Sequence, residues 1–545
     1  MSSDTLLRIR DLRIEAHVGD DWTEIVHGVD LDLRRSEVLG LIGESGAGKS
    51  TIGLAAMGYS RDGCRISGGS IDFDGIDLRA ASERQLRHLK GSRIAYVAQS
   101  AAASFNPAHR LMWQHTEGPL IHKGIARHES EAEAIDLYRR LRLPNPEEIG
   151  FRYPHQVSGG QLQRAMTAMA MSCKPDLIIF DEPTTALDVT TQIEVLAAIR
   201  NVVREFGTAA IYITHDLAVV AQMADRIKVL LRGDDVEEAE TAKMLAAPQE
   251  EYTKSLWAVR SFQTEARPAD TAGDTPVVRV RNVTAGYGAV TVLKDINIDI
   301  HRGRTVAVVG ESGSGKSTVA RVITGLLAPS VGTVQFDGTD LAPSYKARPL
   351  EQLGRIQIIY QSADTALNAA QRVREIVGRP LELHQGLKGR AQEDRVRELL
   401  AEIDLDPDTY IDRYPGELSG GQKQRIGIAR ALAADPDFII CDEVTSALDQ
   451  LVAEGILRLL KRLQETRNIA YLFITHDLAT VRAIADDVVV MQSGEVVESA
   501  PREVMFTPPH HPYTELLLSS VPEMNAGWLD SVLKERDPES IGGGS

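Results

Sequence analysis

The chain is poor in cysteine and has no long hydrophobic run, and each shortage excludes a class of protein. Its three cysteines, Cys64, Cys173 and Cys441, are scattered through 545 residues, fit no metal-ligand spacing and suit a reducing compartment. No stretch approaches the roughly 18 consecutive apolar residues of a membrane-spanning helix. The first residues, Met-Ser-Ser-Asp-Thr-Leu-Leu-Arg, lack the apolar region of a signal peptide, so we expect no secretion signal.

Basic residues are also in short supply. The chain has 60 Lys and Arg against 77 Asp and Glu, which gives a formal net charge of −17. Nucleic-acid-binding proteins usually present a basic face, so this balance argues against a nucleic-acid partner. Hydrophobic residues at 43% and charged residues at 25% are typical of a globular protein with an ample core. The length predicts more than one domain.

A glycine-rich motif of the form G-x-x-x-x-G-K-[ST] occurs twice. Each copy follows an apolar run that is typical of a buried parallel strand, and each precedes a helical pattern. The glycines let backbone N–H groups and the helix N-terminus face an anion, while the lysine reaches the β- and γ-phosphates of a nucleotide. One copy could be a loop that binds nothing, but two copies in matching context favour two ATP sites. The copies are Gly43, Glu44, Ser45, Gly46, Ala47, Gly48, Lys49, Ser50, Thr51 and Gly310, Glu311, Ser312, Gly313, Ser314, Gly315, Lys316, Ser317, Thr318.

Other landmarks recur in the same order in both halves. Gln99 returns as Gln361, and a Ser-Gly-Gly-Gln run, a strand-end Asp-Glu pair and a strand-end histidine return 261 residues later. A near-constant offset over several landmarks indicates a tandem duplication. We therefore expect a first domain at 1–261, a flexible linker at 262–276, a second domain at 277–530 and a flexible tail at 531–545, with helical parts at about 100–170 and about 362–432.

The paired landmarks supply what phosphoryl transfer from ATP to water requires. The reaction needs a phosphate cradle, a metal ion, a group that places the water and a group that meets charge on the γ-phosphate. Each carboxylate pair alone is more often a helix cap or a solvated edge, and each histidine more often structural. Their joint recurrence favours the catalytic interpretation. We expect Ser50, Gln99, Asp181, Ser317, Gln361 and Asp442 to bind Mg²⁺, Glu182 and Glu443 to act as general bases or orient water, and His215 and His476 to contact the γ-phosphate or hold the glutamates.

These motifs, in this order, resemble the ATP-binding-cassette (ABC) ATPase domain over nearly the whole chain. The resemblance implies an α/β fold of two tandem P-loop NTPase domains, each with a RecA-like core, an antiparallel β part and a helical subdomain. A narrower likeness lies in Ser104-Phe105-Asn106-Pro107 after Gln99, and in the Tyr-Thr pairs at Tyr252 and Tyr513. These segments are similar to the ATPase subunits of oligopeptide, dipeptide and nickel importers, here with two subunits fused.

The resemblance also implies an arrangement and a set of partners. In ABC proteins two cassettes pack head to tail, so the Lys49 site would be closed by Ser419, Gly420, Gly421 and Gln422, and the Lys316 site by Ser158, Gly159, Gly160 and Gln161. The implied cofactors are ATP and Mg²⁺. The implied partners are two transmembrane permease subunits, docked on the helical parts, and through them an extracytoplasmic solute-binding protein, with this chain peripheral at the cytoplasmic face of the membrane. Related importers carry a C-terminal cysteine cluster that resembles an iron–sulfur site; no cysteine follows Cys441, so we expect no cluster.

Other functions stay open beside peptide import. A soluble tandem ABC ATPase of translation would usually carry a long, charged helical linker, and a DNA-repair ATPase would need zinc-type cysteines or a coiled-coil insertion. Neither feature is present. Within import, nickel or another small solute is the alternative cargo to peptides.

The two halves differ where the adenine of ATP should bind. Tyr287, between Gly286 and Gly288, is expected to stack on the base. The first half is four residues longer here, and Tyr287 aligns with Ala16 or Asp20 according to the side from which it is aligned. His17 and Trp22 lie close by and could substitute, or could be exposed loop residues. We therefore predict weaker ATP binding at the Lys49 site than at the Lys316 site.

Overall fold

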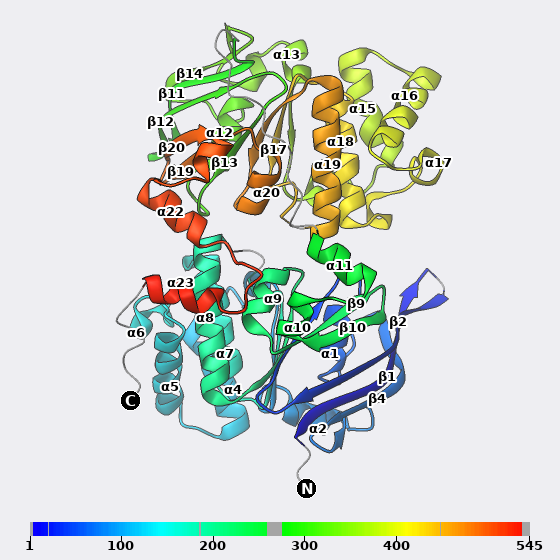
Figure 1. Cartoon of the computed structure of the whole chain (residues 1–545), viewed down its shortest axis with the longest axis vertical. Helices are drawn as coiled ribbons and strands as arrows, with labels where there is room; N and C mark the ends of the chain where they lie inside the picture. Colours follow the sequence, from blue (N-terminus) through cyan, green and yellow to red (C-terminus); the bar gives the residue numbers. More distant parts are fainter. Residues whose placement is uncertain (1–3, 20, 185–186, 259–274, 447, 537–545) are drawn as a thin grey trace. The chain divides into compact units, whose positions relative to one another are not determined.

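The computed structural model describes residues 4–19, 21–184, 187–258, 275–446 and 448–536. The chain divides into a first unit, Met1–Ala258 with Pro522–Ser545, and a second unit, Val259–Val521. Residues 262–274 of the predicted linker lie outside the described residues. No helix in the described ranges is long and apolar enough to cross a membrane. The two units share one architecture (Figure 1).

An antiparallel four-stranded sheet opens each unit, in the order β2-β1-β4-β5 or β12-β11-β14-β15. Apolar and polar residues alternate along these strands, because one face packs on the core and the other meets water. In β1, Leu7 and Ile9 are fully buried while Arg8 between them is exposed. The strands are β1 (Thr5–Val18), β2 (Asp21–Arg34), β4 (Cys64–Phe73), β5 (Ile76–Asp77), β11 (Val278–Tyr287), β12 (Val290–Ile300), β14 (Val331–Phe336) and β15 (Thr339–Asp340).

A six-stranded central sheet carries the P-loop of each unit, in the order β10-β9-β3-β8-β7-β6 or β16-β17-β18-β13-β19-β20. Five strands are parallel, and β10 and β20 pair antiparallel at one edge. Strands β3, β7 and β8 are buried at every position, as expected of parallel strands covered on both faces. The strands are β3 (Val38–Ile42), β6 (Ile94–Val97), β7 (Leu177–Asp181), β8 (Ala209–Ile213), β9 (Arg226–Leu231), β10 (Asp234–Glu240), β13 (Thr305–Val309), β16 (Ile356–Ile359), β17 (Phe438–Asp442), β18 (Ala470–Ile474), β19 (Asp487–Gln492) and β20 (Glu495–Pro501).

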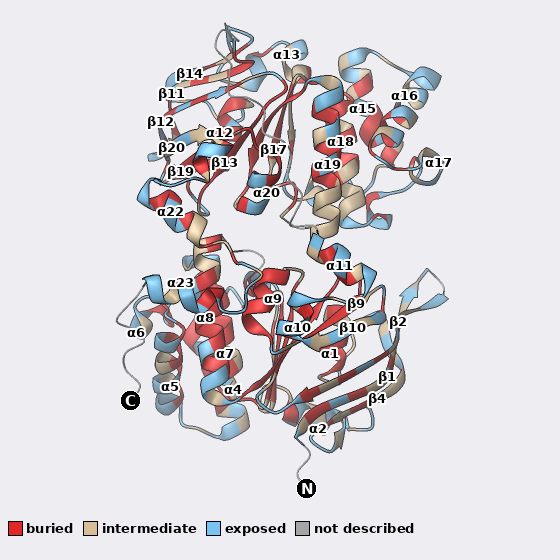
Figure 2. Ribbon diagram, viewed as in Figure 1, coloured by how far each residue is buried: buried red, intermediate tan, exposed pale blue. Residues whose placement is uncertain are grey.

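The helices of the first unit cover its central sheet and form a separate helical part beside it (Figures 1 and 2). Buried residues line the central strands and the inner faces of α7 and α8 (Figure 2). The helices are α1 (Lys49–Ala55), α2 (Glu83–Leu89), α3 (Ala101–Ser104), α4 (Leu111–Lys123), α5 (Arg127–Arg140), α6 (Pro146–Ile149), η1 (Pro154–Gln156), α7 (Gly159–Met171), α8 (Val189–Phe206), α9 (Leu217–Met223), α10 (Thr241–Ala246), α11 (Glu251–Ala258) and α23 (Trp528–Arg536).

The helices of the second unit follow nearly the same order, with an added 3-10 helix, η3. One buried apolar cluster joins its helical part to the central sheet, from Val373 in α15 to Phe473 in β18. The helices are α12 (Lys316–Ile323), η3 (Tyr345–Ala347), α13 (Leu350–Arg355), α14 (Ala363–Ala366), α15 (Val373–Gln385), α16 (Gly389–Glu402), α17 (Pro407–Tyr410), η4 (Pro415–Glu417), α18 (Gly420–Leu432), α19 (Gln450–Arg467), α20 (Leu478–Ile484), α21 (Arg502–Met505) and α22 (Pro512–Ser519).

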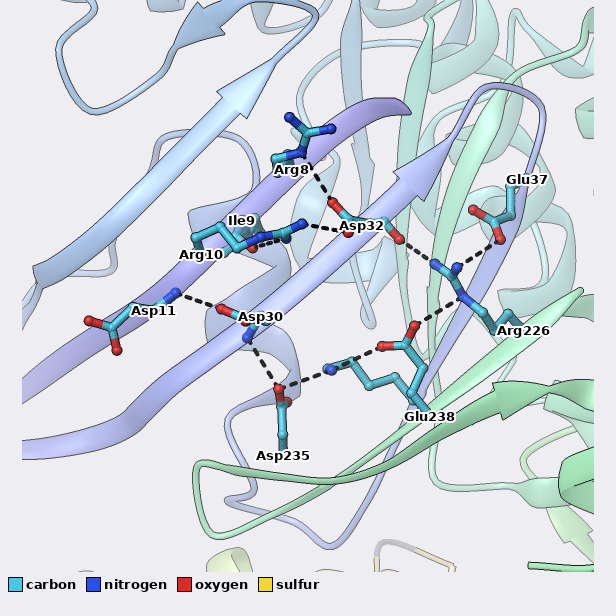
Figure 3. Close-up of polar contacts among 11 residues, drawn as sticks. Arg8, Ile9, Arg10, Asp11, Asp30, Asp32, Glu37, Arg226, Asp235 and Glu238 are labelled. Carbon is cyan, nitrogen blue, oxygen red and sulfur yellow. Dashed lines mark hydrogen bonds and ion pairs between the residues drawn. The ribbon is translucent and has the colours of Figure 1, made fainter. Parts of the chain in front are cut away.

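Charged side chains join the antiparallel sheet of the first unit to the edge of its central sheet (Figure 3). Arg226, at the start of β9, pairs with Glu37 at 3.6 Å and with Glu238 at 3.2 Å, and buried Lys228 reaches Glu238 at 3.0 Å. The corresponding pair in the second unit has the opposite polarity. Arg304 stands where Glu37 does, just before the P-loop strand, and its guanidinium bonds Asp487, the counterpart of Arg226, at 3.0 Å.

The last described residues, 522–536, pack on the first unit, and we call this segment the strap. The Gln222 side chain in α9 donates to the carbonyls of Glu523 (2.9 Å) and Asn525 (2.8 Å) and accepts from the Leu529 N–H (3.0 Å). Asp530 pairs with buried Arg200 of α8. Trp528, Leu529 and Val532 are buried.

We expected the second domain to run to residue 530 and to be followed by a flexible tail. The structure places this boundary differently. Helix α23 (Trp528–Arg536) crosses that boundary, and residues 522–536 belong to the first unit. The physical reason is that apolar side chains near the end of the chain are buried against α8 and α9 rather than left in water. Residues 537–545 of the predicted tail lie outside the described residues.

Candidate functional site

The two P-loops have the same local geometry. Lys49 begins α1, is buried, and its Nζ donates to the carbonyls of Gly43 (2.7 Å) and Glu44 (2.8 Å). Lys316 begins α12 and donates in the same way to Gly310 (2.8 Å) and Glu311 (2.7 Å). The lysines and the helix N-termini therefore lie on the rim of the loop where phosphate groups would bind.

The first glycine of each loop is required by its surroundings. Gly43 has φ +150°, and a Cβ there would stand 2.2 Å from the carbonyl oxygen of Leu230. Gly310 has φ +149° and would meet the Met491 carbonyl oxygen at the same distance. Any side chain would push the loop off the neighbouring strand, so both P-loops need glycine at this position.

Strand ends of the first unit bring the other predicted residues together. Ser50 Oγ donates to Asp181 Oδ1 at 2.7 Å, and the Gln99 side-chain amide donates to Glu182 Oε2 at 2.8 Å. His215 Nδ1 lies 3.1 Å from Glu182 Oε1. Oxygen donors such as Ser50 and Asp181 suit a hard cation, so the set fits Mg²⁺.

The second unit repeats this constellation. Ser317 Oγ donates to Asp442 Oδ1 at 3.1 Å, Gln361 donates to Glu443 Oε2 at 2.7 Å, and His476 Nδ1 lies 3.5 Å from Glu443 Oε1. Gln361 thus contacts Glu443 in this structure, and its expected contact with Mg²⁺ stays a prediction.

Each glutamate has an unusual backbone conformation. Glu182 has φ 49° and Glu443 has φ 52°, in the left-handed region that non-glycine residues rarely adopt. Their N–H groups donate at 2.9 Å to the carbonyls of Ile213 and Ile474 on the neighbouring strand. The turn directs each carboxylate to its glutamine and histidine, and such strain is typical of functional residues.

The glutamate–histidine pairs are electrostatically coupled. Burial would lower the pKa of His215, but the hydrogen bond to Glu182 and its charge raise that pKa above its ordinary value. The pKa of His476 is raised in the same way by Glu443. Burial would raise the pKa of Glu443, yet the bond from His476 and its charge hold that pKa below its usual range. Glu443 is therefore held as the carboxylate, the form that a general base needs.

The Ser-Gly-Gly-Gln runs begin helices α7 and α18. Ser158 caps α7 and accepts from the Gln161 N–H at 3.3 Å, and Ser419 caps α18 and accepts from the Gln422 N–H at the same distance. The serines and the first glycine of each run are exposed.

Strand pairing shows how the two halves correspond in the segments where the adenine is expected to bind. In the first unit Val26 lies against the P-loop glycine Gly48 and pairs with Ile14 of β1. In the second unit Leu293 lies against Gly315 and pairs with Ala285 of β11, so Ile14 and Ala285 are equivalent positions. Two residues further along, Tyr287 corresponds to Ala16. Tyr287 Oη accepts a hydrogen bond at 2.8 Å from Arg321 of α12, the helix that follows the P-loop.

Trp22, the candidate substitute, has partners within its own antiparallel sheet. It pairs with His17 across the strands, edge to face at 5.2 Å between ring centroids, and the Arg65 guanidinium lies 4.1 Å from its ring. Its role at the adenine stays a prediction.

Three tyrosines at the sites have roles that sequence reasoning did not assign. The P-loop N–H of Glu44 donates to Tyr252 Oη at 3.2 Å, and that of Glu311 to Tyr513 Oη at 2.9 Å. Their recurrence 261 residues apart was a usable signal. Tyr96 Oη donates to Asp181 Oδ2 at 2.6 Å from the strand beside it, and no motif marks it.

Two P-loops, each with an Asp-Glu pair and a histidine on a mostly parallel sheet, define a duplicated P-loop ATPase. Family models agree with this class and narrow it. The model described as ABC transporter matches residues 26–185 and 293–446, and the model described as Oligopeptide/dipeptide transporter, C-terminal region, matches residues 497–542.

Full-length relatives share this organisation. A glutathione import ATP-binding protein, GsiA, of Pectobacterium atrosepticum is 38% identical and aligns with 95% of this chain and 89% of its own length. The protein of the same name from Salmonella paratyphi A is 36% identical over 96% of this chain and 90% of its own length. The archaeal ribosome recycling factor aABCE1, solved with the ribosomal stalk protein aP1, matches with a TM-score of 0.61 at 20% identity over 90% of each chain, which shows a shared fold alone.

The chain belongs to the ABC transporter family and is an ATP-hydrolysing subunit of the oligopeptide/dipeptide importer type, with two cassettes in one chain. This confirms the expected family, fold class and ATPase activity.

Proposed function

We propose that this chain drives an importer of short peptides by hydrolysing Mg²⁺·ATP at two sites, with both units catalytically competent. The observation that carries the proposal is the matching geometry of the two clusters. Each unit has a P-loop lysine, a serine bonded to a strand-end aspartate, and a glutamate held between a glutamine and a histidine. The relatives named for glutathione import favour a short peptide as cargo over nickel or another small solute.

The sites are proposed to close head to tail. The Ser419 run would cover the ATP on Lys49, and the Ser158 run the ATP on Lys316. One feature supports this: the first glycine of each run, Gly159 or Gly420, is exposed at a helix N-terminus, where its backbone N–H can face an anion with no bulky side chain in the way. Backbone donors of this kind suit the negative γ-phosphate.

The proposed partners are two separate permease subunits and, through them, an extracytoplasmic solute-binding protein. In this proposal the chain is peripheral at the cytoplasmic face of the membrane. The helical parts of the two units offer different surfaces for docking. In the first unit the exposed Trp113 ring stacks on His109 at 5.4 Å, and Phe151 nearby is also exposed. The positions of Trp113 and Phe151 are taken in the second unit by Glu375 and Asp412. This difference favours two unlike permease subunits over two copies of one.

Glutamine substitutions test the catalytic part of the proposal. Glu182→Gln and Glu443→Gln keep the shape of the side chain but remove the base, whose contribution to rate is about 10²- to 10⁴-fold in other enzymes. Each single change should lower ATP turnover in the assembled transporter, and the double change should nearly abolish it. A single variant with unchanged turnover would show that its site is regulatory.

Arginine substitutions test the pairing. Ser158→Arg should reduce photo-crosslinking of ATP to the Lys316 P-loop, and Ser419→Arg to the Lys49 P-loop. Loss at the P-loop of the same unit would contradict the head-to-tail arrangement.

Transport assays test the cargo. Labelled glutathione and labelled dipeptides should compete for uptake into vesicles that contain the purified transporter. Uptake of nickel alone would overturn peptide import.

A further inference from the structure

The strand-end aspartates of the two units are held differently. Asp181 is buried, and both of its carboxylate oxygens accept hydrogen bonds: Oδ1 from Ser50 Oγ at 2.7 Å and Oδ2 from Tyr96 Oη at 2.6 Å. Asp442 is partly exposed, and Ser317 Oγ donates to its Oδ1 at 3.1 Å. Within the described part of the chain, Asp442 Oδ2 accepts no hydrogen bond.

The difference comes from one residue on the neighbouring strand. In β6 Tyr96 pairs with Ile179, two positions before Asp181, and in β16 Ile358 pairs with Ile440, two positions before Asp442. Tyr96 and Ile358 therefore occupy the same place in the two sheets. Ile358 packs against the apolar core of its unit and has no group that could donate to a carboxylate.

We propose that Tyr96 is a positioning residue for the Mg²⁺-binding aspartate of the first unit, and that the Tyr96/Ile358 difference makes the Mg²⁺ sites of the two units unequal. This inference rests on the proposed role of Asp181 and Asp442 as Mg²⁺ ligands. Tyr96 does not touch the metal. It fixes the rotation of the Asp181 carboxylate, so that the oxygen shared with Ser50 is presented in one orientation.

Preorganisation sets the direction of the effect. A carboxylate held at both oxygens loses little freedom when a cation binds, whereas the Asp442 carboxylate must be ordered by the metal itself. The first unit should therefore bind the metal more tightly than the second, whatever the order of their ATP affinities. Groups that orient metal ligands typically change metal affinity by about 10- to 100-fold when removed.

The competing explanation is that Tyr96 only fills space. Its ring packs against the apolar core of the first unit, and its hydroxyl would then bond Asp181 simply because it is the nearest acceptor. Tyr96→Phe separates the two explanations, because it keeps the ring and removes the hydroxyl. Tyr59→Phe is the matched control, since the Tyr59 ring is largely exposed.

Each site can be measured alone with Mn²⁺ as the probe. Lys316→Ala leaves the first unit's ATP site, Lys49→Ala leaves the second unit's, and electron paramagnetic resonance reports free Mn²⁺ during titration of the full-length protein with ATP. In the Lys316→Ala background, Tyr96→Phe should weaken Mn²⁺ binding by about 10-fold or more. ATP affinity measured in a chelator, without metal, should not change, and Tyr59→Phe should change neither quantity.

The reciprocal variant completes the test. In the Lys49→Ala background, Ile358→Tyr should strengthen Mn²⁺ binding at the second unit, with the fold checked by thermal unfolding. Unchanged Mn²⁺ affinity in Tyr96→Phe, or an equal loss of metal-free ATP binding, would overturn the inference while leaving both ATP sites intact. Failure of either unsubstituted site to take up Mn²⁺ with ATP would overturn the proposed Mg²⁺·ATP sites as well.

Discussion

Substitution Gln222→Ala removes the side chain that binds the strap at three backbone positions. Gln222 is buried, and its carboxamide satisfies the carbonyls of Glu523 and Asn525 and the N–H of Leu529. At the equivalent position of the second unit the chain has Ala483, so alanine is compatible with the helix itself. The substitution therefore tests the docking of the strap with little change to α9.

The hydrogen bonds set the size of the effect. A buried intramolecular hydrogen bond contributes about 1 kcal/mol net, so three lost bonds weaken docking by about 3 kcal/mol. At 1.4 kcal/mol for each factor of ten, the docking equilibrium should fall by about 100-fold. Leu529, Trp528 and Val532 stay buried, and each side chain contributes about 2 kcal/mol. The strap should thus open far more often yet remain docked for most of the time.

Hydrogen–deuterium exchange measures this opening directly. Amides of α23 (Trp528–Arg536) should exchange about 100-fold faster in Gln222→Ala, while amides of α22 (Pro512–Ser519) in the second unit keep their rates. Gln335→Ala, the same substitution at a partly exposed site of the second unit, serves as the control and should leave both helices unchanged. Unchanged exchange in α23 of the Gln222 variant would show that apolar contacts alone hold the strap, and the reasoning from hydrogen bonds would be wrong.

Four further predictions concern the sites. Tyr513→Phe removes the acceptor of the Glu311 N–H and should lower the free energy of unfolding of the second unit by about 1 kcal/mol in denaturant titrations; no change would mean that water replaces the hydroxyl. The pKa of His215 is raised in the folded state, so its stabilising contribution is fully present below its ordinary pKa and is lost as pH rises through the raised value. The difference in free energy of unfolding between the unsubstituted protein and His215→Gln should therefore shrink with increasing pH. A difference that widens would contradict this prediction. Tyr287→Ala in the Lys49→Ala background should weaken ATP binding by about 1–3 kcal/mol in equilibrium titrations, and an equal loss from Trp22→Ala at the other site would show that the two sites are symmetric. Anaerobically purified protein should contain no stoichiometric iron by elemental analysis.

The sequence alone was sufficient for the features that rest on local motifs and their repetition. The P-loops could be predicted because glycines, lysine and serine must follow one another directly, and the duplicated order of Gln99, Asp181 and His215 identified the rest of each cluster. Tyr96 could not be predicted, because it is one residue of an ordinary buried strand and its partner Asp181 lies 85 residues further along. The strap was missed for a related reason: its short helix α23 mixes the buried Trp528, Leu529 and Val532 with charged residues, and only tertiary packing on Gln222 and α8 gives it a place.

The reversed ion pairs beside the P-loop strands bear on how this chain avoids misfolding. Two similar halves joined in one chain can exchange equivalent strands while they fold, which is a characteristic failure of repeat proteins. If β19 took the place of β9 beside β3, Asp487 would face Glu37, and the converse exchange would set Arg226 against Arg304. Each wrong pairing places like charges where the correct one places opposite charges. The polarity of these two pairs therefore acts as a label that matches each strand to its own half.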